Sequence, residues 1–299
     1  MVELSPRHPQ PPAKTPLAVG LGFFDCVHLG HRKLLAEVIE TARRLACAPC
    51  VSTFSNNPYR IFSAESKAVY TYAERLTLFE ALGVTHVLPF EFDAGLQATG
   101  KDAFLDMLFS AFDIRAVVCG HDYKFGRRGE GDAEYLKRYA ESRGAEVTIV
   151  GPVLADGIRV SSTLIKEYLE KGELERANRL LGGPFFACGT VGGGCGRGRL
   201  YGFPTANLMT DGDKLLPCDG VYATQTAVDG KLYRSVTHIG AKPTFADAAR
   251  SVETLLDGFS GDLYGKEIKV GFLSRLRGIE KFPSPQALRE QICKDLLMR

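Results

Sequence analysis

Long hydrophobic runs and blocks of basic residues are both missing from this sequence, and each absence excludes a class of protein. No stretch of the 299 residues approaches the roughly twenty apolar residues of a membrane-spanning helix. The formal net charge is only +2, which argues against nucleic acid as a main partner. We therefore expect neither a membrane nor a nucleic acid among the partners.

A secretory leader and a disulfide framework are also lacking. Residues 1–16 carry five prolines and few apolar residues, so we expect a disordered tail rather than a signal peptide, in a cytoplasmic protein. The eight cysteines are scattered along the chain, which is not the pattern of a disulfide scaffold. Cys47 and Cys50 have the spacing of a metal-binding pair, but no second pair or histidine stands nearby, so we interpret the spacing as chance.

The length of the chain exceeds what one hydrophobic core usually organises and so predicts two domains. Hydrophobic residues make up 45% and charged residues 24%, which is ordinary for a globular protein. The character of the sequence changes near Gly183. We place residues 17–182 in one domain and residues 183–299 in another.

Residues 18–31 indicate a strand, a tight turn and the start of a helix. Residues 17–24 form an apolar run that predicts a strand buried on both faces, with Gly20 and Gly22 near its end. Beyond the turn, apolar residues recur at helical spacing. His28 and His31 therefore stand in the entry and first turn of a helix, where free backbone N–H groups favour phosphate.

Two common nucleotide-binding fingerprints are absent from this turn. The third glycine position of the dinucleotide motif holds Asp25, and no G-x-x-x-x-G-K-[ST] loop is present. Instead the turn contains His28, Gly30 and His31, whose imidazoles can donate to phosphate while the glycine permits close approach. The alternative is a pair of ordinary surface histidines. The motif resembles the H-x-G-H motif of the nucleotidylyltransferase superfamily, which binds ATP phosphates during adenylyl transfer.

Strand-like and helix-like segments alternate through the first half and predict an α/β, doubly wound, Rossmann-like domain with a parallel sheet. Ligands bind at the carboxyl ends of such strands, and polar groups follow several of them here. Taken singly, each group could be an ordinary loop or helix cap. Together they favour a nucleotide site that includes Asn57, Asp122, Arg159, Ser161, Ser162, Thr163 and Lys166.

The second half is rich in short β-like runs separated by turn residues, which predicts a small antiparallel barrel. Ser284 and Pro285 then open a closing helix. Thr205 and Asn207 would face the same side of an extended segment, where their oxygens suit Mg²⁺. The alternative is a turn with incidental polarity. A glycine-rich cationic loop precedes them, with Gly196, Arg197, Gly198 and Arg199.

Five motifs of the second half resemble the riboflavin kinase domain in order and spacing: G-F-P-T-A-N at residues 202–207, and residues 240–245, 251–253, 262–265 and 281–282. The chain from about residue 17 to its end resembles the prokaryotic bifunctional riboflavin kinase and FMN adenylyltransferase family. The resemblance implies two reactions. Riboflavin and ATP give FMN in the C-terminal domain, and FMN and ATP give FAD and pyrophosphate in the N-terminal domain.

The resemblance also implies a role for each matching residue. Glu253 would be the general base on the ribityl 5′-hydroxyl, and Thr205 and Asn207 would hold Mg²⁺ with ATP. His28 and His31 would stabilise charge on the α-phosphate. The remaining expected ATP- or phosphate-binding residues are Gly22, Phe23, Asp25, Gly30, Asn57, Asp122, Arg159, Ser161, Ser162, Thr163 and Lys166 in the first domain and Gly196, Arg197, Gly198, Arg199, Pro204 and Thr205 in the second.

Four residues depart from the family pattern. Cys26 stands where the loop usually has glycine and would need a backbone angle that a non-glycine residue can hold, or some strain. Asn57 stands where histidine is common, and Lys166 replaces an arginine, losing its bidentate fork. Tyr201 replaces an aliphatic residue of the kinase motif.

These departures keep three alternatives open. The first is a riboflavin kinase whose adenylyltransferase domain has decayed into a scaffold. The second is an adenylyltransferase for a different phosphate, and the third is a non-catalytic flavin-binding regulator. The oligomeric state is not predicted.

Overall fold

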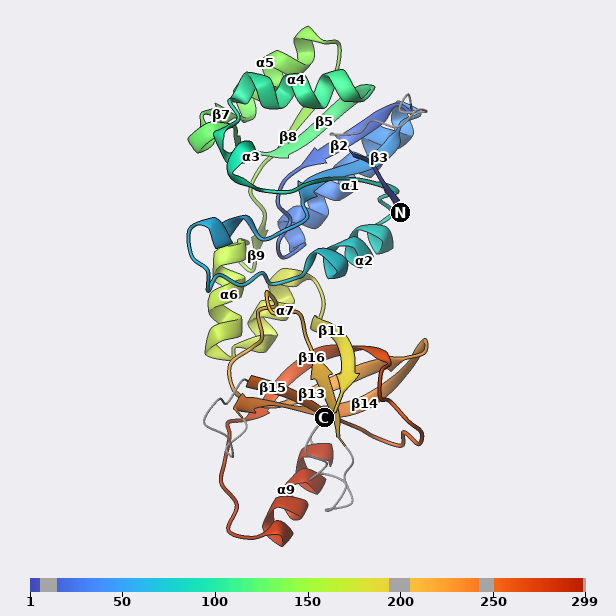
Figure 1. Cartoon of the computed structure of the whole chain (residues 1–299), viewed down its shortest axis with the longest axis vertical. Coiled ribbons are helices and arrows are strands. Elements are labelled where there is room, and N and C mark those ends of the chain that lie inside the picture. Colours follow the sequence, from blue (N-terminus) through green and yellow to red (C-terminus); the bar gives the residue numbers. More distant parts are fainter. Residues whose placement is uncertain (6–14, 194–204, 242–249, 298–299) are drawn as a thin grey trace. The chain divides into compact units, whose positions relative to one another are not determined.

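The computed structural model describes residues 1–5, 15–193, 205–241 and 250–297. The chain divides into two compact units, Met1–Ser161 and Ser162–Arg299, which are described one at a time (Figure 1). This division by contacts places the helices before Gly183 in the second unit. The domain boundary expected near Gly183 remains a prediction. No helix in the described ranges is long and apolar enough to cross a membrane.

The first unit contains a six-stranded sheet in the order β1-β4-β3-β2-β5-β8, and every neighbouring pair is parallel. Strand β2 is central, with β3 and β5 on its two sides, so the chain leaves it in both directions as in a doubly wound fold. The strands are β1 (Val2–Glu3), β2 (Leu17–Leu21), β3 (Ala48–Phe54), β4 (His86–Phe90), β5 (Ile114–Gly120) and β8 (Glu146–Val150).

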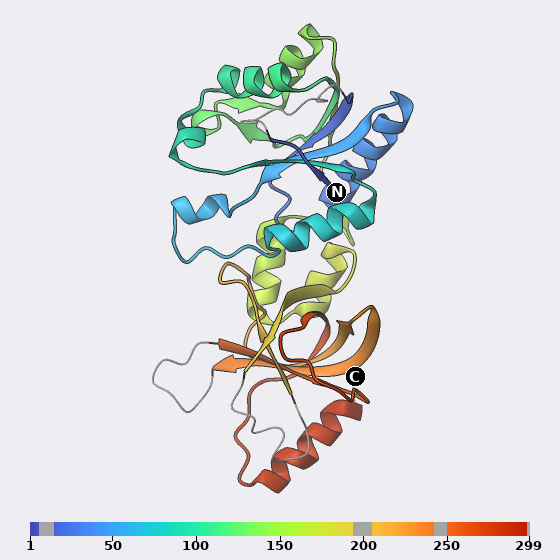
Figure 2. The same cartoon turned by 45° about the vertical axis from the view of Figure 1, so that its right-hand side comes forward.

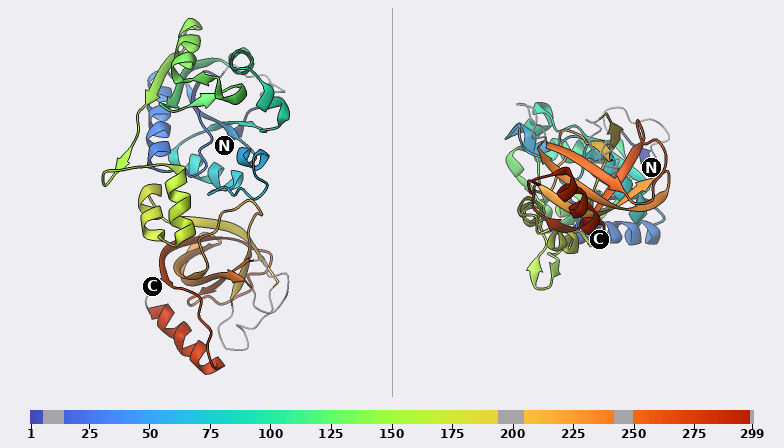
Figure 3. Two further views of the ribbon diagram at one scale, coloured as in Figure 1. Left: turned by 90° about the vertical axis from the view of Figure 1, so that its left-hand side faces the viewer. Right: turned by 90° about the horizontal axis from the view of Figure 1, so that it is seen from below.

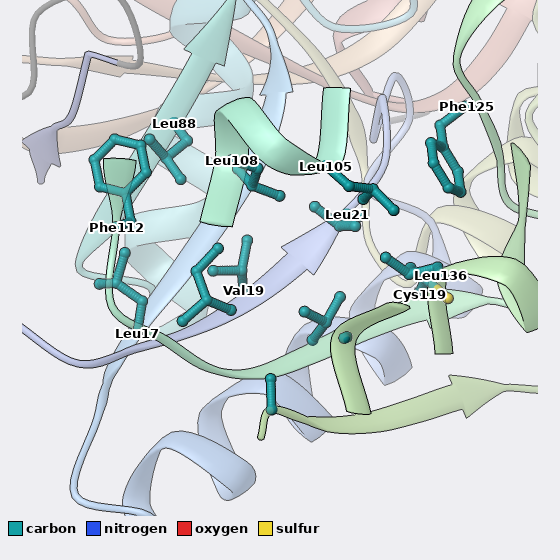
Figure 4. Packing of buried hydrophobic residues seen from close by; sticks show 14 of the residues in the cluster. Leu17, Val19, Leu21, Leu88, Leu105, Leu108, Phe112, Cys119, Phe125 and Leu136 are labelled. Atoms are coloured by element: carbon teal, nitrogen blue, oxygen red, sulfur yellow. The ribbon is translucent and has the colours of Figure 1, made fainter. Parts of the chain in front are cut away.

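Helices cover both faces of this sheet, which is why its central strands are apolar on both sides (Figure 1). Helices α1 (Leu29–Arg44) and α2 (Tyr72–Leu82) bury Leu35, Val38 and Phe79 on one face. Helices α4 (Lys101–Ala111) and α5 (Ala133–Ser142) pack on the other face, where Leu105 and Leu108 meet the side chains of β2 (Figure 4). The predicted α/β class is confirmed.

The start of the chain departs from the expected disordered tail. Val2–Glu3 forms a short parallel edge strand on β4, and the terminal ammonium lies 3.2 Å from a carboxylate oxygen of Glu80. Two residues give no periodicity from which a strand could be predicted.

Strand β2 ends at Leu21, three residues before the predicted limit, because Gly22 begins the turn.

The first unit is completed by short elements in the loops: the 3₁₀ turns η1 (Pro58–Ile61) and η2 (Arg127–Gly129), helix α3 (Ala94–Ala98), and the strands β6 (Lys124–Phe125), β7 (Gly131–Asp132), β9 (Leu154–Ala155) and β10 (Ile158–Arg159). Most of them follow the carboxyl ends of the sheet strands.

The second unit begins with helices α6 (Ser162–Lys171) and α7 (Leu174–Leu181), which lie side by side (Figure 2). A closed antiparallel barrel of six strands follows in the order β11-β12-β15-β14-β13-β16, and α9 (Pro285–Leu297) comes after it (Figure 3). The strands are β11 (Phe185–Gly192), β12 (Ala206–Met209), β13 (Gly220–Val228), β14 (Lys231–Ala241), β15 (Arg250–Leu256) and β16 (Glu267–Arg277). The predicted barrel and closing helix are confirmed.

One part of the barrel core is polar but fully hydrogen-bonded. Five hydroxyls that are at most 1% exposed form a chain with oxygen separations of 2.7 to 2.9 Å. Each hydroxyl therefore has a partner despite its burial. The chain runs through Thr226, Ser235, Thr224, Thr237 and Thr254. Since alternate residues of a strand face opposite sides, Glu253 and His238 lie on the outer face of the barrel.

Candidate active sites

A cavity of about 1050 Å³ lies in the first unit, where the loops after β2, β3 and β5 meet. This is the position at which a doubly wound sheet binds its ligand, because loops on either side of the central strand diverge there. Of the residues singled out in the sequence, Gly22, Phe23, His31 and Asp122 line it.

His28 is the N-cap of helix α1. Its Nδ1 accepts a hydrogen bond of 3.2 Å from the backbone N–H of His31, which satisfies a free donor of the first helical turn. A neutral histidine that accepts at Nδ1 carries its proton on Nε2. The cap therefore leaves His28 with one N–H that can donate to a ligand.

The two imidazoles of the H-x-G-H motif stack on each other, with ring centroids 3.7 Å apart and planes 11° apart. Burial lowers the pKa of His28 to about 4. Burial, with smaller contributions from His28 and from Arg75, lowers the pKa of His31 well below its usual value. Both rings are therefore neutral at pH 7 and act as hydrogen-bonding groups rather than as cations.

Two glycines of this turn, Gly22 and Gly30, lie close to aromatic rings. A Cβ at Gly30 would lie 3.1 Å from the His28 ring, and a Cβ at Gly22 would lie 3.1 Å from the Phe24 ring. A side chain at either position would push on a ring of the site. Gly20 has a packing reason, since its Cβ would lie 2.9 Å from Val38 of α1.

Asp122 and Arg159, which stand 37 positions apart, form one ion pair at the cavity. Nη2 of Arg159 lies 3.0 Å from Oδ2 of Asp122 and 3.3 Å from Nε2 of His121. Asp122 also opposes part of the effect of burial on the pKa of His28. Both side chains are exposed, so the arginine can exchange this partner for a phosphate.

Two other predicted residues hold loops. Oδ1 of Asp25 accepts from the backbone N–H of Val69 at 2.9 Å. Asn57 caps η1, with Oδ1 accepting from Tyr59 N–H at 3.1 Å and Nδ2 donating to the Ser66 carbonyl at 3.0 Å. The amide of Asn57 is thus engaged in shaping the loop beside the cavity.

Of the two outcomes expected for Cys26, the structure shows a backbone angle that a non-glycine residue can hold, and the positive φ angles of this turn lie at Phe24 and Val27. Phe24 has φ 55° and Val27 has φ 43°, whereas Cys26 is not among the non-glycine residues with positive φ. A left-handed angle is especially unfavourable for a β-branched residue such as Val27. Cys26 is fully buried, so it acts there as a small core residue.

The hydroxyl cluster after Arg159 spans the end of one unit and the beginning of the other. Ser161 is the last residue of the first unit. Ser162, Thr163 and Lys166 belong to α6, which packs with the second unit. Their expected role toward the phosphates of the first site stays a prediction.

Aromatic side chains form much of the remaining cavity wall. Phe23 lies near Phe54 and Tyr59, with ring centroids 6.0 and 5.8 Å apart, and Tyr123 stacks on Phe125 at 5.6 Å. Such a wall suits a flat, conjugated ligand. Sequence reasoning singled out Phe23 but missed the wall that it forms with the other rings, because those rings come from separate loops.

Arg75 is a second feature that sequence reasoning missed. This side chain is 2% exposed, and its guanidinium donates to the carbonyls of Phe23 and Phe54 and to the Thr53 hydroxyl. An arginine in a helix ordinarily lies at the solvated surface, so no local signal in the sequence marked this one as buried.

The second site lies across three neighbouring barrel strands. Glu253 of β15 is the register partner of Asn207 on β12 and of His238 on β14. Directly paired residues of an antiparallel sheet project to the same face, so these side chains form one row. Burial lowers the pKa of His238, and nearby Glu253 opposes that effect. The sequence pointed to Glu253 and Asn207 but not to His238.

The surroundings of Asn207 fix how its amide is used. Its side chain is buried, and Nδ2 donates to the Gly193 carbonyl at 3.1 Å, which leaves Oδ1 as the ligand atom. Thr205 is exposed and directly precedes β12. The other predicted residues of this site, Gly196, Arg197, Gly198, Arg199 and Pro204, lie outside the described residues.

No group of three or more His, Cys, Asp and Glu side chains in the described ranges could hold a metal ion. The hydroxyl of Thr205 and the amide oxygen of Asn207 are donors of the kind that Mg²⁺ accepts, together with phosphate oxygens.

Comparison with known proteins gives matches to both halves. A family model described as FAD synthetase matches residues 10–164, and one described as riboflavin kinase matches residues 181–298. A Listeria monocytogenes protein described as bifunctional riboflavin kinase/FMN adenylyltransferase is 35% identical over 93% of this chain and 89% of its own length. An Escherichia coli protein of the same description is 32% identical over 93% of this chain and 90% of its own length.

A solved structure from Streptococcus pneumoniae also matches, with a TM-score of 0.86 and 29% identity over 99% of this chain and 97% of that one. It is described as a macrolide-efflux protein. The two family models match the two halves of the chain, and both relatives carry a description that combines the two activities. The chain belongs to the bifunctional riboflavin kinase/FMN adenylyltransferase family.

Proposed function

We propose that the chain carries out two successive reactions on one flavin. The second unit transfers a phosphoryl group from ATP to riboflavin, and the first unit transfers an adenylyl group from ATP to the resulting FMN. The observation that carries the adenylyl transfer is the stacked, neutral pair of His28 and His31, of which His31 lines the large cavity. Because both reactions consume ATP, we place the protein in the cytoplasm.

In the adenylyl transfer, a phosphate oxygen of FMN attacks the α-phosphorus of ATP and pyrophosphate leaves. The nucleophile is already ionised, so the protein has no proton to remove. Its task is to orient the two phosphates and stabilise the charge that develops between them. The Nε2–H of His28 and the His31 ring do this at the helix start, and Arg159 neutralises the phosphates that leave. We assign Ser161, Ser162, Thr163 and Lys166 to the same pyrophosphate.

The aromatic wall explains why the acceptor is a flavin phosphate rather than another phosphate ester. Phe23 and Phe54 form one pair of rings that lines the cavity, and Tyr123 and Phe125 form another. A tricyclic isoalloxazine ring would bury its faces against these rings, at a gain of about 0.5–1.5 kcal/mol for each well-placed aromatic pair beyond area burial.

In the phosphoryl transfer, the nucleophile is the ribityl hydroxyl, which does need a base. Glu253 would accept that proton as the oxygen attacks the γ-phosphorus. Its register neighbours place an amide on one side and an imidazole on the other. The hydrogen bond from Asn207 to Gly193 keeps the amide oxygen available beside the carboxylate.

The family's use of ATP implies a divalent metal, and we propose Mg²⁺ in the second unit. Thr205 and Asn207 fit it, since they offer a hydroxyl and an oriented amide oxygen. When bound, the ion would neutralise charge on the ATP phosphates. Asn207→Ala should therefore lower riboflavin phosphorylation about tenfold and raise the magnesium concentration needed for half-maximal rate. An unchanged magnesium dependence would contradict this assignment.

The observations favour two activities over a kinase with a decayed first domain, because the FAD synthetase model matches that domain and its histidine motif is intact. The efflux description belongs to the Streptococcus pneumoniae protein alone. One assay tests the proposal: riboflavin and MgATP are incubated with the full chain, and FMN and FAD are separated by chromatography. We expect FMN first and FAD after it. FMN without FAD would support the kinase-only alternative.

A further inference from the structure

Arg75 is a buried cation next to the adenylyl-transfer cavity, yet it does not face that cavity. Burial is the main cause that lowers its pKa, to about 10, so it stays charged at pH 7. Burying a guanidinium is costly unless its donors find good acceptors. The acceptors it has found therefore indicate what the side chain does.

These acceptors join the ends of two neighbouring strands. Nη1 of Arg75 lies 3.0 Å from the Phe23 carbonyl, just beyond β2, and 2.7 Å from the Thr53 hydroxyl in β3. Nη2 lies 2.7 Å from the Phe54 carbonyl, at the last residue of β3. The Thr53 hydroxyl donates in turn to the Phe23 carbonyl at 2.7 Å. One planar group thus holds two loops that both line the cavity.

The same cation also contacts the cavity wall through a ring. The guanidinium carbon of Arg75 lies 5.0 Å from the centroid of Phe23, within the range of a cation–π contact. Phe23 in turn lies against Phe54, with centroids 6.0 Å apart. Arg75 therefore fixes both the backbone of Phe23, through the hydrogen bond to its carbonyl, and the orientation of its ring, through the cation–π contact.

We propose that Arg75 is a positioning residue for adenylyl transfer, which fixes Phe23 and Phe54 as the wall that receives the flavin ring. This inference rests on the proposed function of the first unit. Arginine is required because its planar fork reaches three acceptors at fixed angles. Lysine keeps the charge but concentrates its donors on one nitrogen atom.

The test uses the full chain with Arg75→Lys and Arg75→Met, and with Arg44→Lys and Arg44→Met as matched controls. Arg44 lies in the same unit, but it is exposed and pairs with Glu146 at the surface. Steady-state FAD formation from FMN and MgATP gives kcat and both KM values. Riboflavin phosphorylation and thermal unfolding are measured on the same samples.

We expect Arg75→Met to lower kcat/KM for FMN about a hundredfold, mainly by raising the KM for FMN and not that for ATP. Arg75→Lys should recover part of this loss and remain about tenfold below the parent. Riboflavin phosphorylation should stay unchanged in both variants, and the Arg44 controls should behave like the parent.

Thr53→Val provides a second test that keeps the buried charge and removes one of its three acceptors. The change keeps the side-chain volume but removes the hydroxyl that links Arg75 to the Phe23 carbonyl. We expect a severalfold rise in the KM for FMN, and less than additive loss when it is combined with Arg75→Lys. Parental KM values for FMN in Arg75→Lys and Thr53→Val would overturn the inference. The inference would also be overturned if the KM for FMN and the KM for ATP rose equally and both changes followed the loss of thermal stability. A parent that forms no FAD would instead overturn the proposed function.

Discussion

The two units bring their site residues together by different structural means. In the first unit, the residues come from separate loops that meet because parallel strands end at one edge of the sheet. In the second, Asn207, Glu253 and His238 come from three neighbouring strands in register. The first site therefore depends on loops and a helix cap, and the second depends on strand register, where a slip of one residue would turn every side chain to the other face.

The largest expected effect separates the two chemistries. Glu253→Gln should lower riboflavin phosphorylation about a thousandfold, because the amide cannot accept the proton of the hydroxyl nucleophile. FAD formation from supplied FMN should stay near the parental rate, since that nucleophile is already ionised. Glu267→Gln, at the exposed start of β16, is the matched control. If the Glu253→Gln variant phosphorylated riboflavin at a rate within tenfold of the parent, Glu253 would not be the general base.

The next effect separates the two functions of His28. His28→Ala should lower FAD formation about a hundredfold through loss of the phosphate-directed donor. His28→Asn restores a side chain that caps helices well but lacks the reach of the imidazole. We expect its thermal stability to match the parent while its FAD formation stays low. Full activity in the asparagine variant would mean that the cap alone matters.

Acidification should destabilise the first unit more than the second. The folded pKa of His28 is lowered to about 4 from 6.5, so the unfolded chain takes up the proton first as the pH falls. Stability present above pH 6.5 is lost between 6.5 and 4, amounting to about 2 kcal/mol from this residue by pH 5. Hydrogen exchange at pH 7 and pH 5, resolved by unit, measures it. His28→Asn should reduce the difference, and equal acid sensitivity in both units would count against the neutral pair.

The smallest expected effect concerns Lys166, on the helix that packs with the second unit. If this lysine binds pyrophosphate through a single charged nitrogen, Lys166→Arg should raise FAD formation a few-fold, because arginine can make a bidentate contact with the pyrophosphate. Lys171→Arg, at the other end of α6, is the control. The rate of riboflavin phosphorylation should not change. If Lys166→Arg gave no gain in FAD formation, the assignment of α6 residues to pyrophosphate binding would be contradicted.

The parts that sequence patterns predicted are those with a regular period or a special turn. The β2 run, the histidine motif at the start of α1 and the barrel strands all have such signals. At Cys26 the sequence left two outcomes open, an ordinary backbone angle or strain. The folded backbone decides between them, since the positive φ angles of the turn lie at Phe24 and Val27 and not at Cys26.

Residues whose partners are distant in sequence could not be predicted. Arg75 reaches carbonyls 52 and 21 positions away, and backbone acceptors leave no mark in a sequence. His238 joins the second site only through the register between β14 and β15. Asn57 was predicted to bind phosphate from its position in a loop, but its amide bonds show that it also shapes that loop.

Because His28 and His31 are neutral, their contacts with phosphate should respond to ionic strength differently from those of Arg159. Neutral N–H donors interact with phosphate over short range, so dissolved salt barely screens them. Arg159 is a full charge at the surface, and its attraction falls off over a Debye length of about 8 Å in physiological salt. Added salt should therefore weaken the initial attraction of nucleotide to this unit, while the contacts made at the helix start keep their strength.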